Sequence, residues 1–494
     1  MTINLKLAKL PYLSNCFLLV FFIFGILLIN RHEMWLDETQ PWLLARDSTS
    51  FPDLLYNKRY DGHPALWYSL LFMVTKFTLN LKALQILHIV LITGFVFIFL
   101  KSGFNLYFKI LFCSGYYILY EYAAITRLYA LELLLAGLAC YVYTTRKKNF
   151  FLLLLLLFLL AQANLFGLIF SSGLLLLLLY EQDFISNKKS WLKYAGITAV
   201  LAGYGFAIYS MKPPPDDFFA AGWNFHWNLD LLKNLMGSIW HSFVPFPALY
   251  VEFWNTNFIR SPEIKTVLGL MVYVWTFTFF TKSPKILILY VFITVSTLLF
   301  FYLKYLGTTR HQGHLFIFFI FCLWLLPTPQ NPFSPGYQSN YKPFIKLFSL
   351  YLILVVNVGA GFFAAAVDWV YPFAPNKQTA QFLENLPYSF NLVAENNFHP
   401  SPIAAYLNRK IYYANTQRFG SYYQTSYEEN QKLTDYQTIQ TGVVLTKKTN
   451  QVSVVILDKE LRLNSNKNNK IKKIFKSDNT ILGKPVYHLY LISL

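Results

Sequence analysis

Charged residues are scarce in this chain. Asp, Glu, Lys and Arg make up 13% of its 494 residues, whereas 55% are hydrophobic and the mean hydropathy is +0.39. Because soluble domains carry about 25% charged residues, this composition excludes an ordinary soluble enzyme. Repeated long apolar runs predict instead a polytopic membrane protein whose first partner is the lipid bilayer.

Cysteine is also rare. The four cysteines all lie inside apolar runs, at Cys16, Cys113, Cys140 and Cys322. This placement argues against a disulfide framework and against a zinc site built from thiolates. The net charge of +18 would indicate nucleic acid in a soluble protein, but here many Lys and Arg residues occupy short loops. They set membrane orientation, and no nucleic-acid partner is expected.

The apolar runs predict about eleven transmembrane helices, at roughly 11–29, 83–100, 109–125, 128–144, 150–162, 164–180, 192–210, 264–281, 286–303, 314–327 and 345–366. The first run is longer than a signal-peptide core and lacks a small-residue cleavage site, which favours a retained span over a signal peptide. Residues 150–180 exceed one span of about 20 residues. Gln162 and Asn164 interrupt them, which favours two short helices over one long tilted helix.

Orientation depends on the apolar segment 64–79, which is either a short span or a helix in the membrane interface. If 64–79 is a helix in the membrane interface, most basic loop residues lie on the cytoplasmic side, as the positive-inside rule prefers. These residues are Lys6, Lys9, Lys101, Lys109, Arg146, Lys147, Lys148, Lys188, Lys189, Lys193, Lys282, Lys285, Lys342 and Lys346. The prediction is a multi-pass protein of the plasma (inner) membrane with a cytoplasmic N-terminus, and with Trp67 and Tyr68 at the outer interface.

Two domains follow from this orientation. Residues 1–366 form an all-α transmembrane domain, with a first outer loop at 30–82, a large outer loop at 211–263 and a short one at 304–313. Residues 367–494 form an extracytoplasmic domain. This polar tail has strand-like runs at 391–394, 410–414, 443–446, 452–457 and 486–492 and a helical stretch at 402–408. Such an order suggests a small α/β domain, whose role is either structural or functional.

The first outer loop gathers polar residues at the level of the lipid headgroups. Asp37 and Glu38 occur in "MWLDETQ", soon after the first span. Lys58, Arg59, Asp61 and His63 occur in and beside "YDGHPALWY", where Gly62 permits a close approach and Pro64 suits a first helical turn. The simpler explanation is that these acids only end the helix and solvate the loop.

Two more segments bring ionisable residues to the same predicted face. Glu121 and Arg127 lie in "LYEYAAITRLYALE", and Arg310, His311 and His314 lie in "GTTRHQGH". Ionisable residues at such depth are functional candidates, and the second group suits a phosphate. Snorkelling arginines and headgroup anchoring are the alternatives.

A carboxylate beside a group of cations at the membrane surface suits group transfer from a lipid phosphate. The acid would take a proton from an acceptor hydroxyl, and the cations would stabilise the departing phosphate. No nucleotide is required in such a scheme, because the donor is already bound to its lipid.

At these motifs the chain resembles the polytopic GT-C glycosyltransferases of the protein O-mannosyltransferase and aminoarabinose-transferase kind. The resemblance covers most of residues 10–366. It rests on Asp37-Glu38, on "GHPALWY", on "TRLYALE", on the paired helices around Gln162 and on "TRHQGHLFIF". "KIYYANTQRFGSY" in the tail is similar to bacterial members of uncharacterised function.

The resemblance implies a GT-C fold, a polyprenyl-phosphate sugar donor and inverting transfer to an extracytoplasmic acceptor. It makes Asp37 the catalytic base with Glu38 as its partner. Arg127 and His63 face and shape the cavity, and Arg310 and its neighbouring histidines contact donor phosphate. The chain departs from the eukaryotic mannosyltransferases in having no trefoil sugar-binding domain. No zinc-binding set is matched, but a divalent metal at Asp37 is left open because some relatives use one.

The sugar stays open, and so does the acceptor, which is a glycan, a lipid or a protein. Two other functions compete with the transferase. One is a transporter or flippase of lipid-linked sugars, although no related halves are found in the sequence. The other is a non-catalytic envelope scaffold, which has no need of an acidic pair at the membrane surface.

Overall fold

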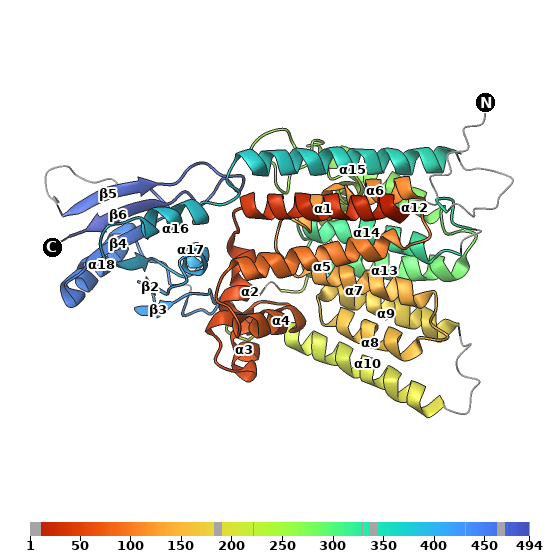
Figure 1. Ribbon diagram of the computed structural model, residues 1–494, viewed down its shortest axis with the longest axis horizontal. Helices are drawn as coiled ribbons and strands as arrows, with labels where there is room; N and C mark the ends of the chain where they lie inside the picture. The colour runs from red at the N-terminus through yellow and green to blue at the C-terminus, as the bar shows by residue number, and fades with distance from the viewer. Residues whose placement is uncertain are drawn as a thin grey trace.

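The computed structural model describes residues 11–181, 190–220, 222–327, 330–334, 344–429, 431–461 and 470–493. A bundle of roughly aligned helices makes up most of the molecule, and a small α/β domain stands at one end of it (Figure 1). The basic residues Lys6, Lys9, Lys188, Lys189 and Lys342 lie outside the described residues. Orientation in the membrane therefore stays a prediction.

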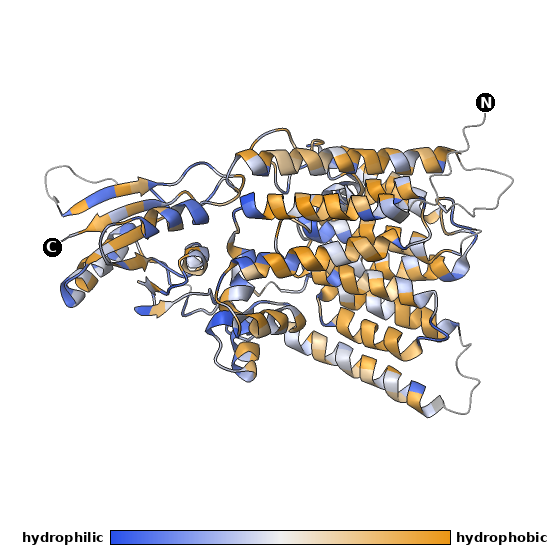
Figure 2. Ribbon diagram, viewed as in Figure 1, coloured by the Kyte–Doolittle hydropathy of each residue, from blue (hydrophilic) through white to orange (hydrophobic). Residues whose placement is uncertain are grey.

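Five helices are long and apolar enough to cross a membrane. They are α1 (Pro11–Arg31), α5 (Lys82–Leu100), α10 (Ser190–Met211), α13 (Pro284–Leu303) and α15 (Phe344–Val370). Hydrophobic residues dominate the whole bundle, whereas the α/β domain is largely hydrophilic (Figure 2). These helices are consistent with the predicted membrane protein, and the count of about eleven spans is not confirmed.

The remaining helices of the bundle and its loops are shorter. They are α2 (Leu36–Asp47), α3 (Phe51–Asn57), η2 (Lys58–Tyr60), α4 (Leu66–Thr75), α6 (Leu106–Cys113), η3 (Tyr116–Glu121), α7 (Tyr129–Tyr143), α8 (Phe150–Ala161), α9 (Leu165–Tyr180), α11 (Leu229–Phe243), α12 (Pro262–Phe277) and α14 (Thr309–Leu325). The break between α8 and α9 confirms two short helices instead of one. Asn164 causes the restart, since its side chain accepts a hydrogen bond of 2.6 Å from the Gly167 amide.

The predicted single span 109–125 is wrong. Helix α6 ends at Cys113, and the chain continues as the π-helical turn η3. Gly115 has an extended backbone that ends the α-helix. Here α15 approaches closely: a Cβ on Gly361 would lie 3.1 Å from the backbone nitrogen of Tyr116. Irregular backbone in a helix often accompanies a functional site.

All three of the predicted outer loops contain helix. Within 211–263 the chain forms α11, which packs so closely on α12 that a Cβ on Gly269 would lie 1.9 Å from the Met236 carbonyl oxygen. Within 304–313 the chain already enters α14 at Thr309.

Helix α4 corresponds to the predicted interfacial helix 64–79, but two of its aromatic residues lie elsewhere than expected. Trp67 and Tyr68 are fully buried, since α4 packs closely on α2. The expectation that they face the membrane interface is therefore wrong. Tertiary packing of the first loop, instead of lipid, covers them.

The α/β domain is built on one six-stranded sheet of order β3-β2-β1-β4-β6-β5. Its elements are α16 (Asn376–Glu384), β1 (Phe390–Ala394), α17 (Ser401–Tyr406), β2 (Ile411–Tyr413), β3 (Arg418–Gly420), α18 (Asp435–Thr449), β4 (Val452–Leu457), β5 (Ile471–Lys476) and β6 (His488–Ile492). Strand β1 pairs in parallel with β2 on one side and with β4 on the other, and the other pairings are antiparallel. The small α/β domain is confirmed.

One predicted strand of this domain, 443–446, is wrong because it lies inside α18. A capping box at Thr434 and Gln437 starts that helix. Ile439, Gly442 and Leu445 then form a buried face at helical spacing, while Val444 between them is 62% exposed. A short run of three apolar residues followed by a threonine fits either structure, and the cap decides for the helix.

The α/β domain lies at the end of the bundle where α1 and α15 finish and α5 starts (Figure 1). It is fastened to the first loop by polar contacts. The Gln40 side chain both donates to the Tyr423 carbonyl, at 2.9 Å, and accepts from its amide, at 3.1 Å. The amide of Met34 donates to the Tyr406 hydroxyl at 2.8 Å. The sheet is thereby held beside α2.

Candidate active site

Helix α2 presents the acidic pair of the first loop. Its first turn contains both Asp37 and Glu38, where negative charge is favoured by the helix dipole. The Glu38 carboxylate accepts a hydrogen bond of 3.0 Å from the Trp35 amide and so satisfies a free donor at the helix start. Consecutive helical residues point in directions about 100° apart, and the two acids accordingly meet different partners.

Asp37 meets two arginines. Its Oδ2 atom lies 2.7 Å from Nη2 of Arg310 and 3.6 Å from Nη1 of Arg127. Arg127 also donates to the Asp37 backbone carbonyl, and its Nη2 atom is 3.3 Å from Nε2 of His63. Segments far apart in the sequence thus converge on one carboxylate, and Asp37, His63, Arg127 and Arg310 are brought together as predicted. We call these four residues the Asp37 cluster.

The electrostatics of the Asp37 cluster keep the acid ionised. Burial raises the pKa of Asp37, but Arg127 and Arg310 outweigh it, and the pKa lies below its ordinary value of 3.8. Burial, together with Arg127, lowers the pKa of His63 to about 3, so its ring is neutral at physiological pH. The cluster therefore carries one negative and two positive charges.

Arg310 has unused hydrogen-bonding capacity. Its guanidinium lies against two indole rings that pack edge-on to each other, 5.3 Å from Trp35 and 5.7 Å from Trp254, and its side chain is 9% exposed. Its Nε and Nη1 atoms are buried and have no hydrogen-bond partner among the described residues, and the same holds for Nε of Arg127. Buried donors are normally satisfied, and planar guanidinium donors fit phosphate oxygens. This is the property expected of an anion site.

Three other predicted residues of the first loop have their hydrogen bonds and ring contacts with residues outside the Asp37 cluster. Asp61 accepts a 2.5 Å hydrogen bond from the Tyr68 hydroxyl, and burial raises its pKa to about 6. Lys58 is buried and donates to the Ser210 carbonyl at 3.0 Å, and burial lowers its pKa to about 8. Arg59 instead covers the rings of Tyr56 and Tyr60 and makes no described contact with the Asp37 cluster.

Glu38 belongs to a separate buried chain of charges. Its Oε2 atom is 3.0 Å from Nε2 of His32, whose Nδ1 atom is 2.7 Å from Oδ2 of Asp368 on α15. The Glu38 Oε1 atom accepts from the Thr126 amide at 2.6 Å. This group, which we call the His32 bridge, joins the ends of α1 and α15 to α2 and to the segment that carries Arg127. Glu38 and its neighbour Asp37 thus belong to two different groups of contacts.

The remaining predicted residues lie outside the Asp37 cluster. Glu121 accepts hydrogen bonds from the Tyr116 hydroxyl and the Trp254 indole, at 2.9 and 3.1 Å. His311 caps α14, its Nδ1 atom being 3.0 Å from the Thr308 amide nitrogen.

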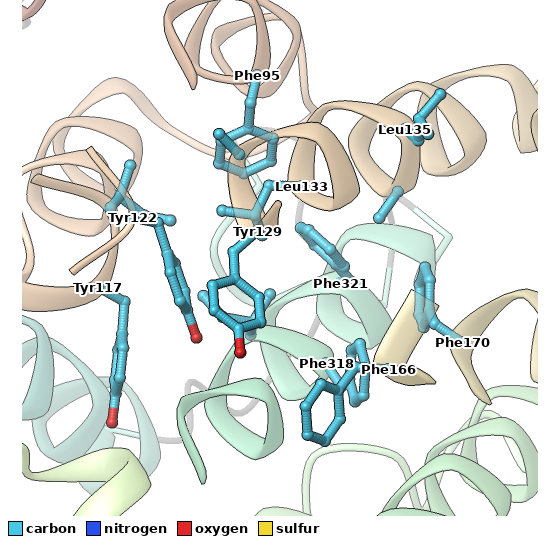
Figure 3. Packing of buried hydrophobic residues seen from close by; sticks show 14 of the residues in the cluster. Phe95, Tyr117, Tyr122, Tyr129, Leu133, Leu135, Phe166, Phe170, Phe318 and Phe321 are labelled. Atoms are coloured by element: carbon cyan, nitrogen blue, oxygen red, sulfur yellow. The ribbon is translucent and has the colours of Figure 1, made fainter. Parts of the chain in front are cut away.

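His314 is fully buried. Its Nε2 atom is 2.8 Å from Oε2 of Glu132, and its ring stacks on Phe166 with centroids 4.0 Å apart. Its ring also lies near those of Tyr122, Tyr129 and Phe318. Figure 3 shows these three aromatic side chains in the buried core. His314 therefore lies among core side chains, and it touches neither Asp37 nor Arg310 in the described contacts.

Sequence reasoning missed several residues of the site. Trp35 and Trp254 both contact Arg310, Asp368 completes the His32 bridge, and the Tyr129 hydroxyl is buried without a partner among the described residues. Asp368 had a signal, since an acid at the end of an apolar run is costly. Trp254 had none, because interfacial tryptophans are common in any membrane protein.

The residues around Asp37 do not fit a divalent cation. No group of three or more His, Cys, Asp or Glu side chains within the described ranges is placed to share a metal ion. The nearest charged neighbours of the Asp37 carboxylate are two arginines, which repel a cation. The open alternative of a metal at Asp37 therefore has no support in the geometry.

Two sizeable cavities are lined by described residues outside the Asp37 cluster. One, of about 610 Å³, is lined by the end of α1, the start of α5 and residues of α16 and α17, and includes His32 and Tyr406. The other, of about 550 Å³, lies in the α/β domain. Neither includes Asp37 among its lining residues.

A scan of the chain against models of protein families gives no match, and a search of curated proteins gives none either. What this chain does is therefore argued from the Asp37 cluster.

Proposed function

We propose that this protein is a membrane glycosyltransferase that moves a sugar from a polyprenyl-phosphate donor to an acceptor hydroxyl. The observation that carries the proposal is Arg310. It is a buried guanidinium with N–H groups that have no partner among the described residues, and it lies against two tryptophans and the carboxylate of Asp37. A structural arginine in a core would have its donors satisfied. An arginine whose role is to bind a phosphate would have unpaired donors until the phosphate is bound.

The arrangement supports an inverting displacement. The acceptor oxygen attacks the anomeric carbon, the bond from that carbon to the phosphate oxygen breaks, and the acceptor proton passes to Asp37. The Oδ1 atom of Asp37 accepts no hydrogen bond from the described residues, and it is the atom assigned to this proton. The departing polyprenyl phosphate takes the electron pair, and Arg310 and Arg127 stabilise its charge. A single displacement from the opposite face inverts the anomeric centre.

The low pKa of Asp37 fits this sequence of events. While both arginines hold Asp37, it is ionised but a weak base. A phosphate that enters the cluster competes for the same guanidinium groups and so weakens their hold on the carboxylate. Asp37 then becomes more basic when the donor is in place, which is when a base is needed.

The His32 bridge supports Asp37 from behind. Glu38 is fully buried and binds His32, Trp35 and Thr126, so it fixes the first turn of α2. We assign Glu38 as the positioning partner of the base. In the same proposal the GT-C fold, the inner-membrane location and the extracytoplasmic α/β domain follow from the resemblance and the positive-inside rule.

The proposal is tested by incubating membranes that contain the protein with radiolabelled polyprenyl-phosphate sugars and measuring label transferred to an endogenous acceptor. Asp37→Asn should lower the rate by about 10² to 10⁴, the contribution of a general base, without lowering expression. Asp230→Asn is the matched control, because this carboxylate is 86% exposed on α11. Movement of labelled lipid across the membrane without its consumption would instead indicate a flippase. Neither transfer nor movement would indicate a scaffold.

A further inference from the structure

The cavity of the α/β domain lies where two parallel strands end. Its walls include Glu395 and Asn396, which follow β1, and Asp458 and Lys459, which follow β4. We call it the switch-point cavity. Its volume of about 550 Å³ is within the range of sites for small ligands.

The topology of the sheet makes this position special. From β1 the chain passes through α17 to β2 on one side, and it later returns through α18 to β4 on the other side of β1. The crevice at the carboxyl ends of β1 and β4 is therefore a topological switch point. In open α/β sheets ligands bind at such points, because the connections leave the strand ends in opposite directions.

The bundle supplies one wall of the same cavity. After α10 the chain runs to the α/β domain, where Asp217 forms a β-bridge with Ser426 and the Phe218 amide donates to the Thr425 carbonyl at 2.9 Å. This places Phe219 at the cavity, 55% exposed, with its ring 5.7 Å from that of Phe398. The cavity is thus formed jointly by both domains, as many binding sites are.

The lining is polar and carries more acid than base. Glu395, Glu429, Asp435 and Asp458 line it, against Lys432 and Lys459. Such a lining repels phosphates and other anions. Carboxylates and the amide of Asn396 accept hydrogen bonds from hydroxyl groups, and an exposed aromatic ring packs on the apolar face of a sugar. The combination favours a neutral, polyhydroxylated ligand.

The cavity is close to the Asp37 cluster. The ring of Phe398 lies 5.3 Å from that of Tyr423, and the backbone of Tyr423 is bound on both sides by Gln40. Gln40 is one helical turn beyond Asp37 on α2. Next to Tyr423, Gln424 lines the cavity. Tyr423 and Gln40 therefore connect the wall of the cavity to the helix that carries Asp37.

We propose that the switch-point cavity binds a neutral oligosaccharide, the outer part of a glycan acceptor. The word acceptor rests on the proposed transferase function, whereas binding of the oligosaccharide does not. Phe219 provides the face on which a sugar ring packs, and Asp458 and Asn396 receive its hydroxyl groups.

The test is a binding measurement on the full-length protein in nanodiscs. A panel of neutral tri- and tetrasaccharides of glucose, galactose, mannose and N-acetylglucosamine is titrated by saturation-transfer NMR and calorimetry. We expect at least one to bind, and Asp458→Asn and Phe219→Ala each to weaken it about tenfold or more, the effect of losing one charge-assisted hydrogen bond or a ring contact. Asp478→Asn and Tyr436→Ala are the controls, because both lie in the same domain outside the lining and should leave affinity unchanged.

Each other result overturns the proposal. These are no binding across the panel, binding that is insensitive to Asp458→Asn and Phe219→Ala, and preferential binding of a phosphorylated sugar or of a peptide. The Asp37→Asn variant distinguishes this proposal from the transferase, because it should bind the oligosaccharide as the unaltered protein does while it fails to transfer label. If transfer fails in the unaltered protein but binding persists, only the transferase assignment is lost.

Discussion

Replacing His32 by glutamine removes the cation that lies between two buried carboxylates. In the intact protein His32 is 1% exposed and contacts both Glu38 and Asp368, at 3.0 and 2.7 Å. Glutamine is of similar length but neutral, so two buried acids would be left without a positive partner. The ends of α1 and α15 and the start of α2 would lose their common contact.

The size of the expected loss of stability follows from the pKa of His32. Burial lowers the pKa of His32, but the two carboxylates outweigh it and raise the pKa to about 10 from 6.5. At about 1.4 kcal/mol per unit, this difference gives at most about 5 kcal/mol. Removal of one partner from a buried ion pair costs about 3 to 5 kcal/mol. We therefore expect His32→Gln to lower the free energy of unfolding by about 3 to 5 kcal/mol at pH 6.5.

The stability that His32 contributes decreases as the pH rises. Because the folded pKa of His32 lies above the unfolded value, its contribution is complete below about pH 6.5 and is lost as pH rises toward about 10. Between pH 6.5 and 9 the intact protein should lose about 3 kcal/mol through this group, which is about 1.4 kcal/mol per pH unit. The free energy of unfolding of His32→Gln should not show this decrease between pH 6.5 and 9.

Unfolding is measured in detergent by tryptophan fluorescence at pH 6.5, 8 and 9. His226→Gln is the control, because His226 is exposed in the large loop and should change neither the stability nor its pH dependence. The reasoning is refuted if His32→Gln is as stable as the intact protein at pH 6.5, or if the variant keeps the full loss of stability at higher pH.

Two further predictions concern α14. Arg310→Lys should reduce kcat/KM for the lipid-linked donor by about 10- to 100-fold, because an ammonium cannot offer the paired donors of a guanidinium. Arg260→Lys, at the exposed end of the large loop, should have no effect. Both variants are measured by steady-state kinetics, and an equal loss in the two would contradict the assignment. Gly313→Ala should cost about 1 to 3 kcal/mol of stability, since its Cβ would lie 2.2 Å from the ring of Tyr117. Gly205→Ala, which meets nothing within 4 Å, should be neutral or stabilising in thermal unfolding, and equal behaviour of the two alanine variants would count against this packing.

Local signals predicted much of the chain. Apolar runs located α1, α5, α10, α13 and α15 because a long hydrophobic stretch has few other uses. Strand β4 was predicted at its observed bounds because 452–457 is β-branched and bounded by polar residues. Short apolar runs were ambiguous: 443–446 proved to be helix, and 109–125 proved to be broken at Gly115.

The candidate site was predicted as a set of residues but not as an arrangement. The four residues of the Asp37 cluster do come together, whereas Arg59 lies on rings at the surface and His314 lies in the core. Arg59 and His314 are of the same residue types as the arginines and the histidine of the Asp37 cluster. Their separation depends on which face of η2 or α14 each occupies, and this is set by packing with distant segments.

The sequence by itself determined that this is a membrane protein and that its acids and cations gather at helix ends, because the cost of burying charge in lipid confines them there. Only the tertiary structure decided that Asp37 meets Arg310, 273 residues away, while its neighbour Glu38 meets His32. The reason is geometric. Two adjacent residues of a helix differ in direction by about 100°, and the partner of each depends on what the rest of the chain places on that side.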